Sequence, residues 1–372
     1  MPRRQRVAAA LAAAVAVVVA MGAGCAHVPV RPAGPPTNVV LMIGDGMGVA
    51  HLTSARIAAG DLEMERLTTG GLVATWSADG LVTDSAASAT AYATGERTLN
   101  GSVSVSPSGV PLKTVLEHAE ERGMATGLVT TCSLTHATPA AFVAHVAGRE
   151  DDCEIARQIA ESDVEVLFGG GLSFFLPAGV QGGARPDGAD LLSALRKRMP
   201  VALTPGDFRR IGRADRAAAL LAPEHPPAAY ERDPALPELT EKALEILSRD
   251  DDGFFLMVEG SQIDWAAHEN EHDWLVEEAL DFDRAVGIVM DFAEMDGRTL
   301  VVVTADHETG GYCLLGGSLA RHEVTEPRFT GDEHTASMTP LLAYGPGSTA
   351  FGGLTDNAAV GRLLIEIVTG AP

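Results

Sequence analysis

The stretch Asn38–Gly48, NVVLMIGDGMG, decides the fold class of this chain. From Val39 to Ile43 it is apolar and rich in β-branched residues, without polar alternation, which is typical of a strand buried on both faces. A glycine turn containing Asp45 follows, and residues 49–59 continue as a predicted helix. A buried strand that leads into a helix indicates a parallel sheet covered by helices. Ligands bind beyond the carboxyl ends of such strands, so Asp45 lies at a predicted site.

The same pattern of apolar strand and helix continues along the chain. We therefore predict an α/β fold with a mostly parallel central β-sheet flanked by helices on both faces, in one domain over residues 38–372. Residues 170–236 are rich in Gly, Pro and Arg and are predicted to be a surface excursion. The further strands are predicted at Ala125–Thr130, Val164–Phe168, Gly253–Val258, Thr299–Thr304 and Pro340–Tyr344, and the helices at Pro111–Arg122, Pro139–Ala147, Cys153–Ala160, Pro237–Leu247, Asp273–Phe292 and Asn357–Val368.

The first 25 residues have the layout of a secretory signal: a basic head, an apolar run over Val7–Met21 and a small-residue stretch that ends at Cys25. The apolar run is short for a spanning helix, which needs ~20 residues. Cys25 after Ala-Gly resembles a bacterial lipoprotein processing site, so we expect its acylation and a lipid anchor. Ordinary signal cleavage is the alternative, because Gly22 stands where a bulky aliphatic residue is usual. Residues 26–37 read as a linker, and we expect export to the periplasm or cell envelope.

The chain is acidic, with a formal net charge of -23 over 372 residues. This charge argues against a nucleic-acid partner and against binding to anionic lipid through a basic face. An anionic substrate would have to be attracted by something other than Lys and Arg. Three cysteines follow the predicted signal, and export allows a disulfide between Cys132 and Cys153, whereas three buried thiols that include Cys313 are the alternative.

Carboxylate and imidazole side chains follow several of the predicted strands. Each alone has a structural explanation, as a turn residue, a helix cap or a solvated histidine. Acidic groups that converge at one sheet edge would repel one another by several kcal/mol unless cations were bound among them. Imidazole with carboxylate suits zinc, and all-oxygen ligation suits magnesium. The candidates are Asp45, Glu259, Asp306 and His307 after strands, Asp264 and His268 four residues apart on a helix, and His334 in a late loop.

The run Thr83–Thr90, TDSAASAT, places Ser85 before a string of small residues. A serine hydroxyl needs a base or a metal to become a nucleophile, and no histidine is near in sequence. Asp84 is predicted to cap a helix that begins at Ser85, and a helix N-terminus favours a developing anion. The alanines that follow leave room for a bulky phosphate.

Six blocks of the chain together resemble the alkaline phosphatase family: NVVLMIGDGMG, TDSAASATAYATG, THATPAAFVAHVAGR, VEGSQIDWAAH, TADHETGGY and EHTASMTPLLAYGPG. The resemblance covers residues 38–347, with the motifs in the family's order. It implies a metal-dependent phosphomonoester hydrolase that acts through a phosphoserine on Ser85. It also implies that Arg149 binds the phosphoryl oxygens, for which its planar fork is suited.

The resemblance implies two zinc ions and one magnesium ion. The first zinc would be held by Asp264, His268 and His334. The second would be held by Asp45, Asp306 and His307. Asp45 would also bridge toward the magnesium, which Thr138 and Glu259 would hold.

Two positions depart from the best-known bacterial members, which have aspartate at the position of His136 and lysine at that of Trp265. Other members have His and Trp there. The departure leaves open whether the third site takes magnesium or zinc. Without a lysine, phosphate should be bound less tightly, so we expect faster product release. Simple packing of Trp265 is the alternative.

Rival functions can be weighed on the same residues. A sulfatase would carry a Cys/Ser-x-Pro-x-Arg block at the nucleophile, and Ser85 is followed by Ala-Ala-Ser-Ala. A phosphodiesterase of the same superfamily stays open, and so does a non-catalytic metal- or phosphate-binding lipoprotein, although Ser85 and Arg149 are both present. The resemblance implies small-molecule phosphomonoesters as substrates, and a homodimer is a further expectation because many relatives are dimers.

Overall fold

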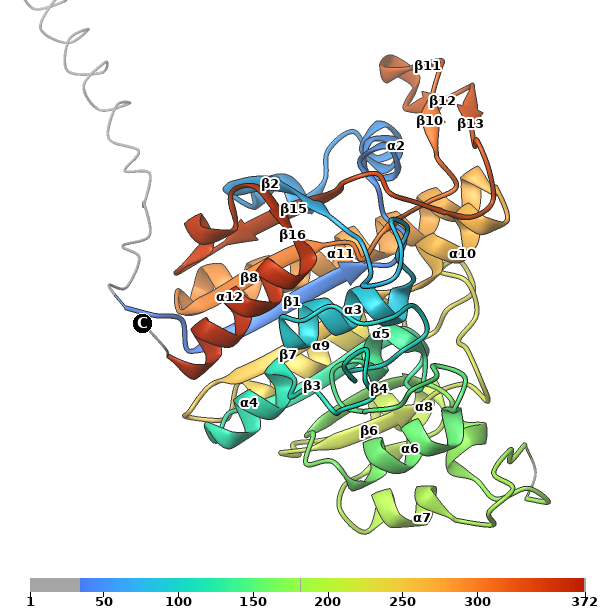
Figure 1. Ribbon diagram of the computed structural model, residues 1–372, viewed down its shortest axis with the longest axis vertical. Coiled ribbons are helices and arrows are strands. Elements are labelled where there is room, and N and C mark those ends of the chain that lie inside the picture. Colours follow the sequence, from blue (N-terminus) through green and yellow to red (C-terminus); the bar gives the residue numbers. More distant parts are fainter. Residues whose placement is uncertain (1–33, 181, 371–372) are drawn as a thin grey trace, which may run out of the picture. The chain divides into compact units, whose positions relative to one another are not determined.

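A ten-stranded sheet organises the chain in the computed structural model, which describes residues 34–180 and 182–370 (Figure 1). The predicted signal peptide over residues 1–25, with Cys25, and most of the linker lie outside the described residues. The sheet has the order β16-β2-β15-β8-β1-β7-β3-β4-β6-β5. Its strands are β1 (Asn38–Gly44), β2 (Thr69–Ala74), β3 (Ala125–Ser133), β4 (Val166–Gly170), β5 (Val201–Ala202), β6 (Ala217–Leu220), β7 (Phe254–Gly260), β8 (Thr299–Thr304), β15 (Thr339–Tyr344) and β16 (Gly353–Asp356).

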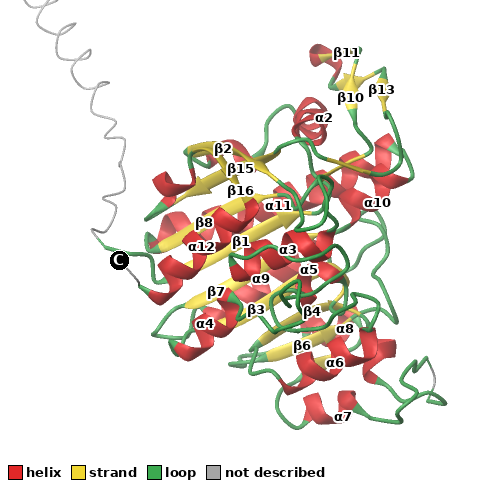
Figure 2. Cartoon of the chain, in the orientation of Figure 1, coloured by secondary structure: helices red, strands yellow, loops and turns green. Residues whose placement is uncertain are grey.

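Strand β1 lies at the centre, parallel to β7 on one side and β8 on the other. Val39 and Leu41 belong to the core on one face of the sheet, and Val40 and Met42 belong to the core on the other. This is why the strand is apolar throughout. Helices cover both faces, and only β15 runs antiparallel to its two neighbours (Figure 2). The predicted fold class is confirmed.

The helices divide between the two faces. One core contains side chains of α3 (Ser85–Thr94), α4 (Val115–Glu121), α5 (Ala137–Ala140), α6 (Asp152–Glu161), α7 (Leu191–Arg196) and α12 (Asn357–Thr369). The other contains side chains of α2 (Val49–Ala59), α8 (Pro205–Arg209), α9 (Leu236–Leu247), α10 (Gln262–His268) and α11 (His272–Asp296). In the described residues no helix is both long enough and apolar enough to cross a membrane.

Three antiparallel two-stranded ribbons lie outside the main sheet: β9 (Glu308–Thr309) with β14 (His334–Thr335), β10 (Cys313–Leu314) with β13 (Pro327–Arg328), and β11 (Gly317–Ser318) with β12 (Glu323–Val324). In the first of them His334 pairs with Thr309. This pairing brings the late loop back to the end of β8.

Two predictions about local structure are wrong. Residues 170–236 are not only a surface excursion, because β6 and β5 extend the central sheet from within them. The sequence of β6, AAAL, lacks the β-branched residues that mark a strand. The helix predicted over Pro139–Ala147 ends at Ala140, because the backbone of Val146 exchanges hydrogen bonds with Val103 instead.

The cysteines also differ from expectation. Cys132, Cys153 and Cys313 are all free, so the suggested Cys132–Cys153 disulfide is absent. Only Cys132 is buried, whereas the other two thiols are half-buried, so the alternative of three buried thiols is wrong as well.

Helix α12 packs against α3, the helix that begins at Ser85. A Cβ atom on Gly361 would lie only 2.2 Å from the carbonyl oxygen of Ala91, so glycine is needed for this close approach. The Asn357 amide donates to Ser88 Oγ at 3.1 Å, and Ser88 Oγ donates to the Asp306 carbonyl at 2.7 Å. The C-terminal helix thus connects α3 to the end of β8.

Candidate metal-binding active site

Three carboxylates lie at the carboxyl ends of the adjacent strands β1, β7 and β8. Asp45, Glu259 and Asp306 have no exposed surface. Both carboxylate oxygens of Asp45, Oε1 of Glu259 and Oδ2 of Asp306 find no hydrogen-bond partner within the described part of the chain. Buried carboxylates without partners are costly unless a cation is bound among them.

The pKa values of these groups reflect the same conflict. Burial raises the pKa of Asp45 well above its ordinary value, and repulsion from Asp306, Asp264 and Glu259 raises it further. Burial also raises the pKa of Glu259 to about 7 and that of Asp306 to about 6. In the absence of cations the cluster therefore retains protons that isolated carboxylic acids would lose.

Gly46 allows the turn after β1 to pass close to the other ligands. Its φ is +72°, and a Cβ atom there would lie 2.8 Å from Cα of Asp264. Its amide donates to Asp306 Oδ1 at 3.1 Å, and the His307 amide donates to the same oxygen at 3.0 Å. These two bonds orient Asp306 so that Oδ2 is left for another partner.

A second group of donors is formed by Asp264, His268 and His334. Each histidine has its Nδ1 next to a backbone carbonyl, at 2.5 Å from Asp332 O for His268 and 2.9 Å from Thr83 O for His334. The two Nε2 atoms consequently face each other at 3.1 Å, and lie 3.3 and 3.6 Å from oxygens of Asp264. A single proton shared by these side chains can form only one of the contacts, whereas a divalent cation would bind Asp264, His268 and His334 together.

The protonation of this second group follows from its contacts. The hydrogen bond to Asp264 raises the pKa of His268 to about 9. Burial acts to raise the pKa of Asp264, but the hydrogen bond from His268 and the neighbouring histidine charges outweigh it, so that pKa lies below its ordinary value. In metal-free protein a protonated His268 therefore takes the place that a cation would fill.

His307 lies between the two groups. Its ring stacks on His334 with the centroids 3.5 Å apart. Its Nδ1 lies 3.2 Å from Thr309 Oγ1, whose hydroxyl donates to Asp264 at 2.5 Å, so Nδ1 carries the proton and donates to Thr309. Burial lowers the pKa of His307 well below its ordinary value, which leaves Nε2 unprotonated. That nitrogen lies 3.6 Å from Asp45 Oδ1 and 3.3 Å from Asp306 Oδ2.

Ser85 is the only hydroxyl that the described residues bring to His307 Nε2, with Oγ at 3.3 Å. The serine is the first residue of α3 and is 2% exposed. Asp84 caps the helix by accepting from the Ala87 amide at 2.9 Å, as predicted. Its other oxygen accepts from Arg149 Nη1 at 3.1 Å, which places the guanidinium beside the start of the helix.

Arg149 also contacts His136, with 3.2 Å between Nη2 and the ring Nε2. Burial and the charge of Arg149 lower the pKa of His136 to about 3. The edge of Trp265 lies against His136, with ring centroids 5.9 Å apart, and His225 packs on the same indole at 4.7 Å. Trp265 is thus part of an aromatic wall beside the arginine, not of the carboxylate cluster.

The arrangement matches known proteins. The model of the alkaline phosphatase family fits residues 36–328. This chain belongs to the alkaline phosphatase family. Alkaline phosphatase 4 of Bacillus subtilis is 35% identical over 83% of this chain and 69% of that protein. The streptomycin-6-phosphate phosphatase of Streptomyces griseus is 35% identical over 88% and 89%. These relatives support alkaline phosphatase activity, that is, hydrolysis of phosphomonoesters, for this chain.

Solved alkaline phosphatase structures agree with this placement. The alkaline phosphatase of the Antarctic bacterium TAB5 superposes with a TM-score of 0.82 and 37% identity, over 90% of this chain and 98% of that one. A variant of the same enzyme, in which a histidine is replaced by aspartate, has magnesium bound in its site named M3. The comparison supports the fold and a metal-dependent site in the family.

The structure places the predicted zinc ligands in the two groups described above, with Ser85 beside His307 and Arg149 beside Asp84. Thr138 is buried and has no hydrogen-bond partner in the described region, and Trp265 lies in the aromatic wall. Sequence reasoning missed Thr309 and His225, and it considered Cys132 only as a disulfide partner or a buried thiol. Thr309 follows His307 by two residues and could have been suspected. His225 lies in the APEHPP loop, inside the segment that was predicted to be a surface excursion, and no spacing pattern marks it.

Proposed function

We propose that the chain hydrolyses phosphomonoesters through a phosphoserine on Ser85, with two zinc ions and a third cation. The observation that supports this most directly is at His307, whose Nε2 lies 3.3 Å from Ser85 Oγ, 3.6 Å from Asp45 Oδ1 and 3.3 Å from Asp306 Oδ2. Both oxygens of Asp45 and Oδ2 of Asp306 lack a hydrogen-bond partner among the described residues. A divalent cation at this position would accept all of these donors and would contact the serine oxygen.

The donor groups of the site fit such ions. Asp264, His268 and His334 would hold one zinc, and Asp45, Asp306 and His307 the other, since mixed imidazole and carboxylate ligands suit zinc. Thr138 and Glu259, with Asp45, would hold the third cation through oxygen atoms, which suits magnesium. When bound, divalent ions lower the pKa of an alcohol and neutralise charge on the entering and leaving oxygens of a phosphoryl transfer.

The protein's own groups would divide the work as follows. Ser85 Oγ loses its proton to solvent and attacks phosphorus; an Oγ–P bond forms, the P–O bond to the leaving group breaks, and the departing alkoxide takes a proton from water. A water molecule then attacks phosphorus, the Oγ–P bond breaks, inorganic phosphate is released, and Ser85 Oγ regains a proton. Arg149 would donate two parallel hydrogen bonds to phosphoryl oxygens, and the N-terminus of α3 favours the negative charge near Ser85. The aromatic wall of His136, Trp265 and His225 excludes water from one side of the phosphate.

The test combines metal analysis with assay of Ser85→Ala on p-nitrophenyl phosphate. The purified protein should contain zinc, and the variant should lose activity at least about 1,000-fold while keeping its metal. Ser108→Ala is the matched control, because that serine is exposed and distant in sequence from the site. Acid quench with labelled substrate should trap phosphate on the wild type and the control but not on Ser85→Ala.

The same assay separates the alternatives. Faster hydrolysis of bis(p-nitrophenyl) phosphate than of the monoester would identify a phosphodiesterase. Metal binding without hydrolysis of either ester would identify a non-catalytic binding protein. Either result would refute the proposed reaction.

Export and lipid attachment are separate proposals, which depend on residues 1–25. Cleavage before Cys25 with acylation should be visible by mass spectrometry of the mature N-terminus, and Cys25→Ala should abolish the lipid mass. Homodimer formation likewise stays a prediction, for which sedimentation analysis of the mature protein is the test.

A further inference from the structure

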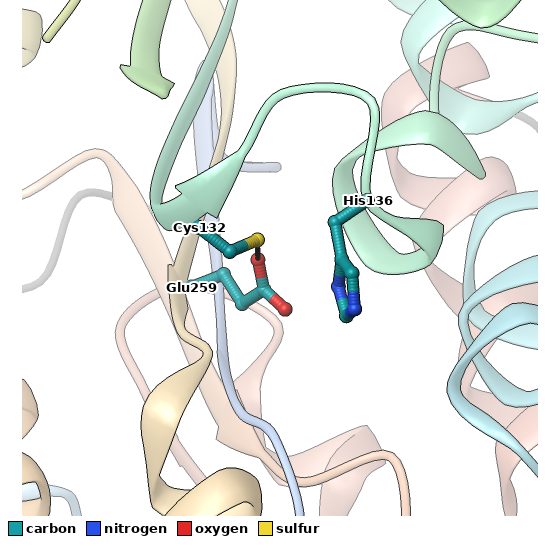
Figure 3. Close-up of side chains that lie close together, drawn as sticks. All are labelled: Cys132, His136 and Glu259. Atoms are coloured by element: carbon teal, nitrogen blue, oxygen red, sulfur yellow. Dashed lines mark hydrogen bonds between the residues drawn. The ribbon is translucent and has the colours of Figure 1, made fainter. Parts of the chain in front are cut away.

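We infer that Cys132, together with His136 and Glu259, forms a sulfur–nitrogen–oxygen donor set that makes zinc, not magnesium, the third cation of this chain. The inference rests on the proposed function, because it concerns the third site of that scheme. One donor atom from each of the three residues lies within 4.8 Å of the others (Figure 3). The picture shows a ring nitrogen of His136 facing the Glu259 carboxylate, with the thiol on the carboxylate's other side.

Strand pairing builds this donor set. Thr130 of β3 pairs with Glu259 of the parallel strand β7. Cys132 lies two residues after Thr130, where the register between β3 and β4 shifts, and its Sγ lies 3.0 Å from Thr130 Oγ1. The thiol reaches Glu259 Oε2 at 3.5 Å, and neither Cys132 nor Glu259 has exposed surface. The position of the sulfur beside the carboxylate is therefore fixed by the sheet.

Two of the three residues have donor atoms to spare. Thr130 donates to Glu259 Oε2 at 2.5 Å, but Glu259 Oε1 is buried without a partner in the described structure. His136 Nδ1 is also buried and unpartnered there. Glu259 Oε1 and His136 Nδ1 are thus free to coordinate a cation, and the Cys132 thiol lies beside the other oxygen of the same carboxylate.

The chemistry of the donors selects the ion. Magnesium takes oxygen ligands and is poorly served by sulfur or imidazole, whereas zinc binds thiolate, imidazole and carboxylate together. Asp45, Thr138 and Glu259 offer an all-oxygen alternative, and both sets share Glu259, so the two ions would compete for one position. A zinc ion that binds Sγ displaces the thiol proton to solvent and forms a Zn–S bond without any redox change.

Ligation at His136 Nδ1 also has a consequence for Arg149. In the structure Nη2 of Arg149 donates to His136 Nε2 at 3.2 Å, which requires the ring proton on Nδ1. A cation at Nδ1 moves that proton to Nε2, which can then no longer accept from the guanidinium. Loading the site would thereby free one donor of Arg149 for the phosphoryl group.

Cobalt substitution tests the ligand directly. The wild-type protein, depleted with a chelator and reloaded with Co²⁺ alone, should show a near-ultraviolet sulfur-to-cobalt charge-transfer band. Cys132→Ser should abolish the band, and Cys153→Ser and Cys313→Ser, which alter the half-buried cysteines, should retain it. After equilibration with equal zinc and magnesium, the wild type should hold about one more zinc per chain than Cys132→Ser.

The outcomes separate this inference from the proposed function. A wild type that binds three cobalt ions and is active, but shows no charge-transfer band, would overturn the role of Cys132 and leave the phosphatase reaction intact. A wild type that holds no zinc at the other two sites, or that does not hydrolyse p-nitrophenyl phosphate, would count against the proposed function itself. If circular dichroism shows that Cys132→Ser fails to fold, the metal content of His136→Asp serves instead. That variant should hold about one zinc fewer per chain, with magnesium in its place.

Discussion

Two groups of buried acids in this molecule have opposite surroundings. Glu278 and Asp281 of α11 have side chains only 1% exposed, and both are paired with Arg232 at 2.7 and 2.8 Å. The Trp274 indole and backbone amides at residues 229 and 236 provide further donors. In the cluster of Asp45, Glu259 and Asp306, by contrast, no arginine or lysine is paired with any of the three within the described residues, and four carboxylate oxygens lack partners.

The difference shows what distinguishes a structural acid from a functional one. Burial alone does not, since both groups are equally hidden. In the α11 group the positive charge comes from Arg232, whose ion pairs hold the loop before α9 against α11. The strand-end group leaves its countercharge to be supplied from solution, which is how so acidic a protein can attract a phosphate dianion.

The largest expected effect comes from removing the bound cations, which supply the positive charge of the strand-end group. Chelation should reduce the rate of p-nitrophenyl phosphate hydrolysis by at least about 10,000-fold, about 5.5 kcal/mol in the barrier. Zinc should restore it, and magnesium alone should not. If the chelated protein, shown by metal analysis to be metal-free, kept substantial activity, the contrast between the two groups would have no functional meaning.

Removing Arg232, which supplies the positive charge of the α11 group, should lower the free energy of unfolding and not the activity. Arg232→Met leaves Glu278 without a charged partner and Asp281 with only the exposed Arg284, at 3.2 Å. The variant should lower the free energy of unfolding by about 3–5 kcal/mol in urea titration, with kcat almost unchanged. Arg209→Ala is the control: its guanidinium is 47% exposed and pairs with Asp233 and Glu238, so the expected loss is below about 1 kcal/mol. Equal losses in the two variants would contradict the structural role of Arg232.

The pH dependence of the metal-free protein offers a third test. Glu259 and Asp306 have folded-state pKa values raised to about 7 and about 6, above the ordinary 4.5 and 3.8. Protonation of these two groups stabilises the folded state. The contribution is complete at a pH below their ordinary pKa values and is lost as the pH rises through 6 and 7. We expect the chelated protein to lose roughly 4 kcal/mol of unfolding free energy between pH 5 and pH 8. The zinc-loaded protein should not show this loss, and an identical profile with and without zinc would exclude the cluster as its source.

The smallest expected effect is at the aromatic wall. Trp265→Lys would place a positive charge of the protein's own beside the phosphate position, so phosphate should be held more tightly. The inhibition constant for phosphate should fall by about tenfold, with slower turnover. Trp265→Phe is the control, which should keep the wild-type constant. An unchanged constant in the lysine variant would mean that Trp265 serves only packing.

The sequence predicted the parts of the molecule that depend on local pattern. The strand at Thr299–Thr304 was placed without error, and the neighbouring carboxylates could be gathered because parallel strands end at one edge. The strand AAAL at 217–220 could not be recognised, since only its pairing with β4 and β5 makes it a strand. The same limit hid Cys132, whose place beside Glu259 depends on the register of β3 against β7 over a separation of 127 residues.

The contact between α12 and α3 determines when the enzyme can become active. A ribosome makes Ser85 well before Gly361 and Asn357, the residues through which α12 contacts α3. A nascent chain therefore carries its nucleophile on a helix without this support until α12 has been made. Chains that terminate before α12 would retain all of the proposed ligand residues but would lack the helix that holds Ser85 beside them.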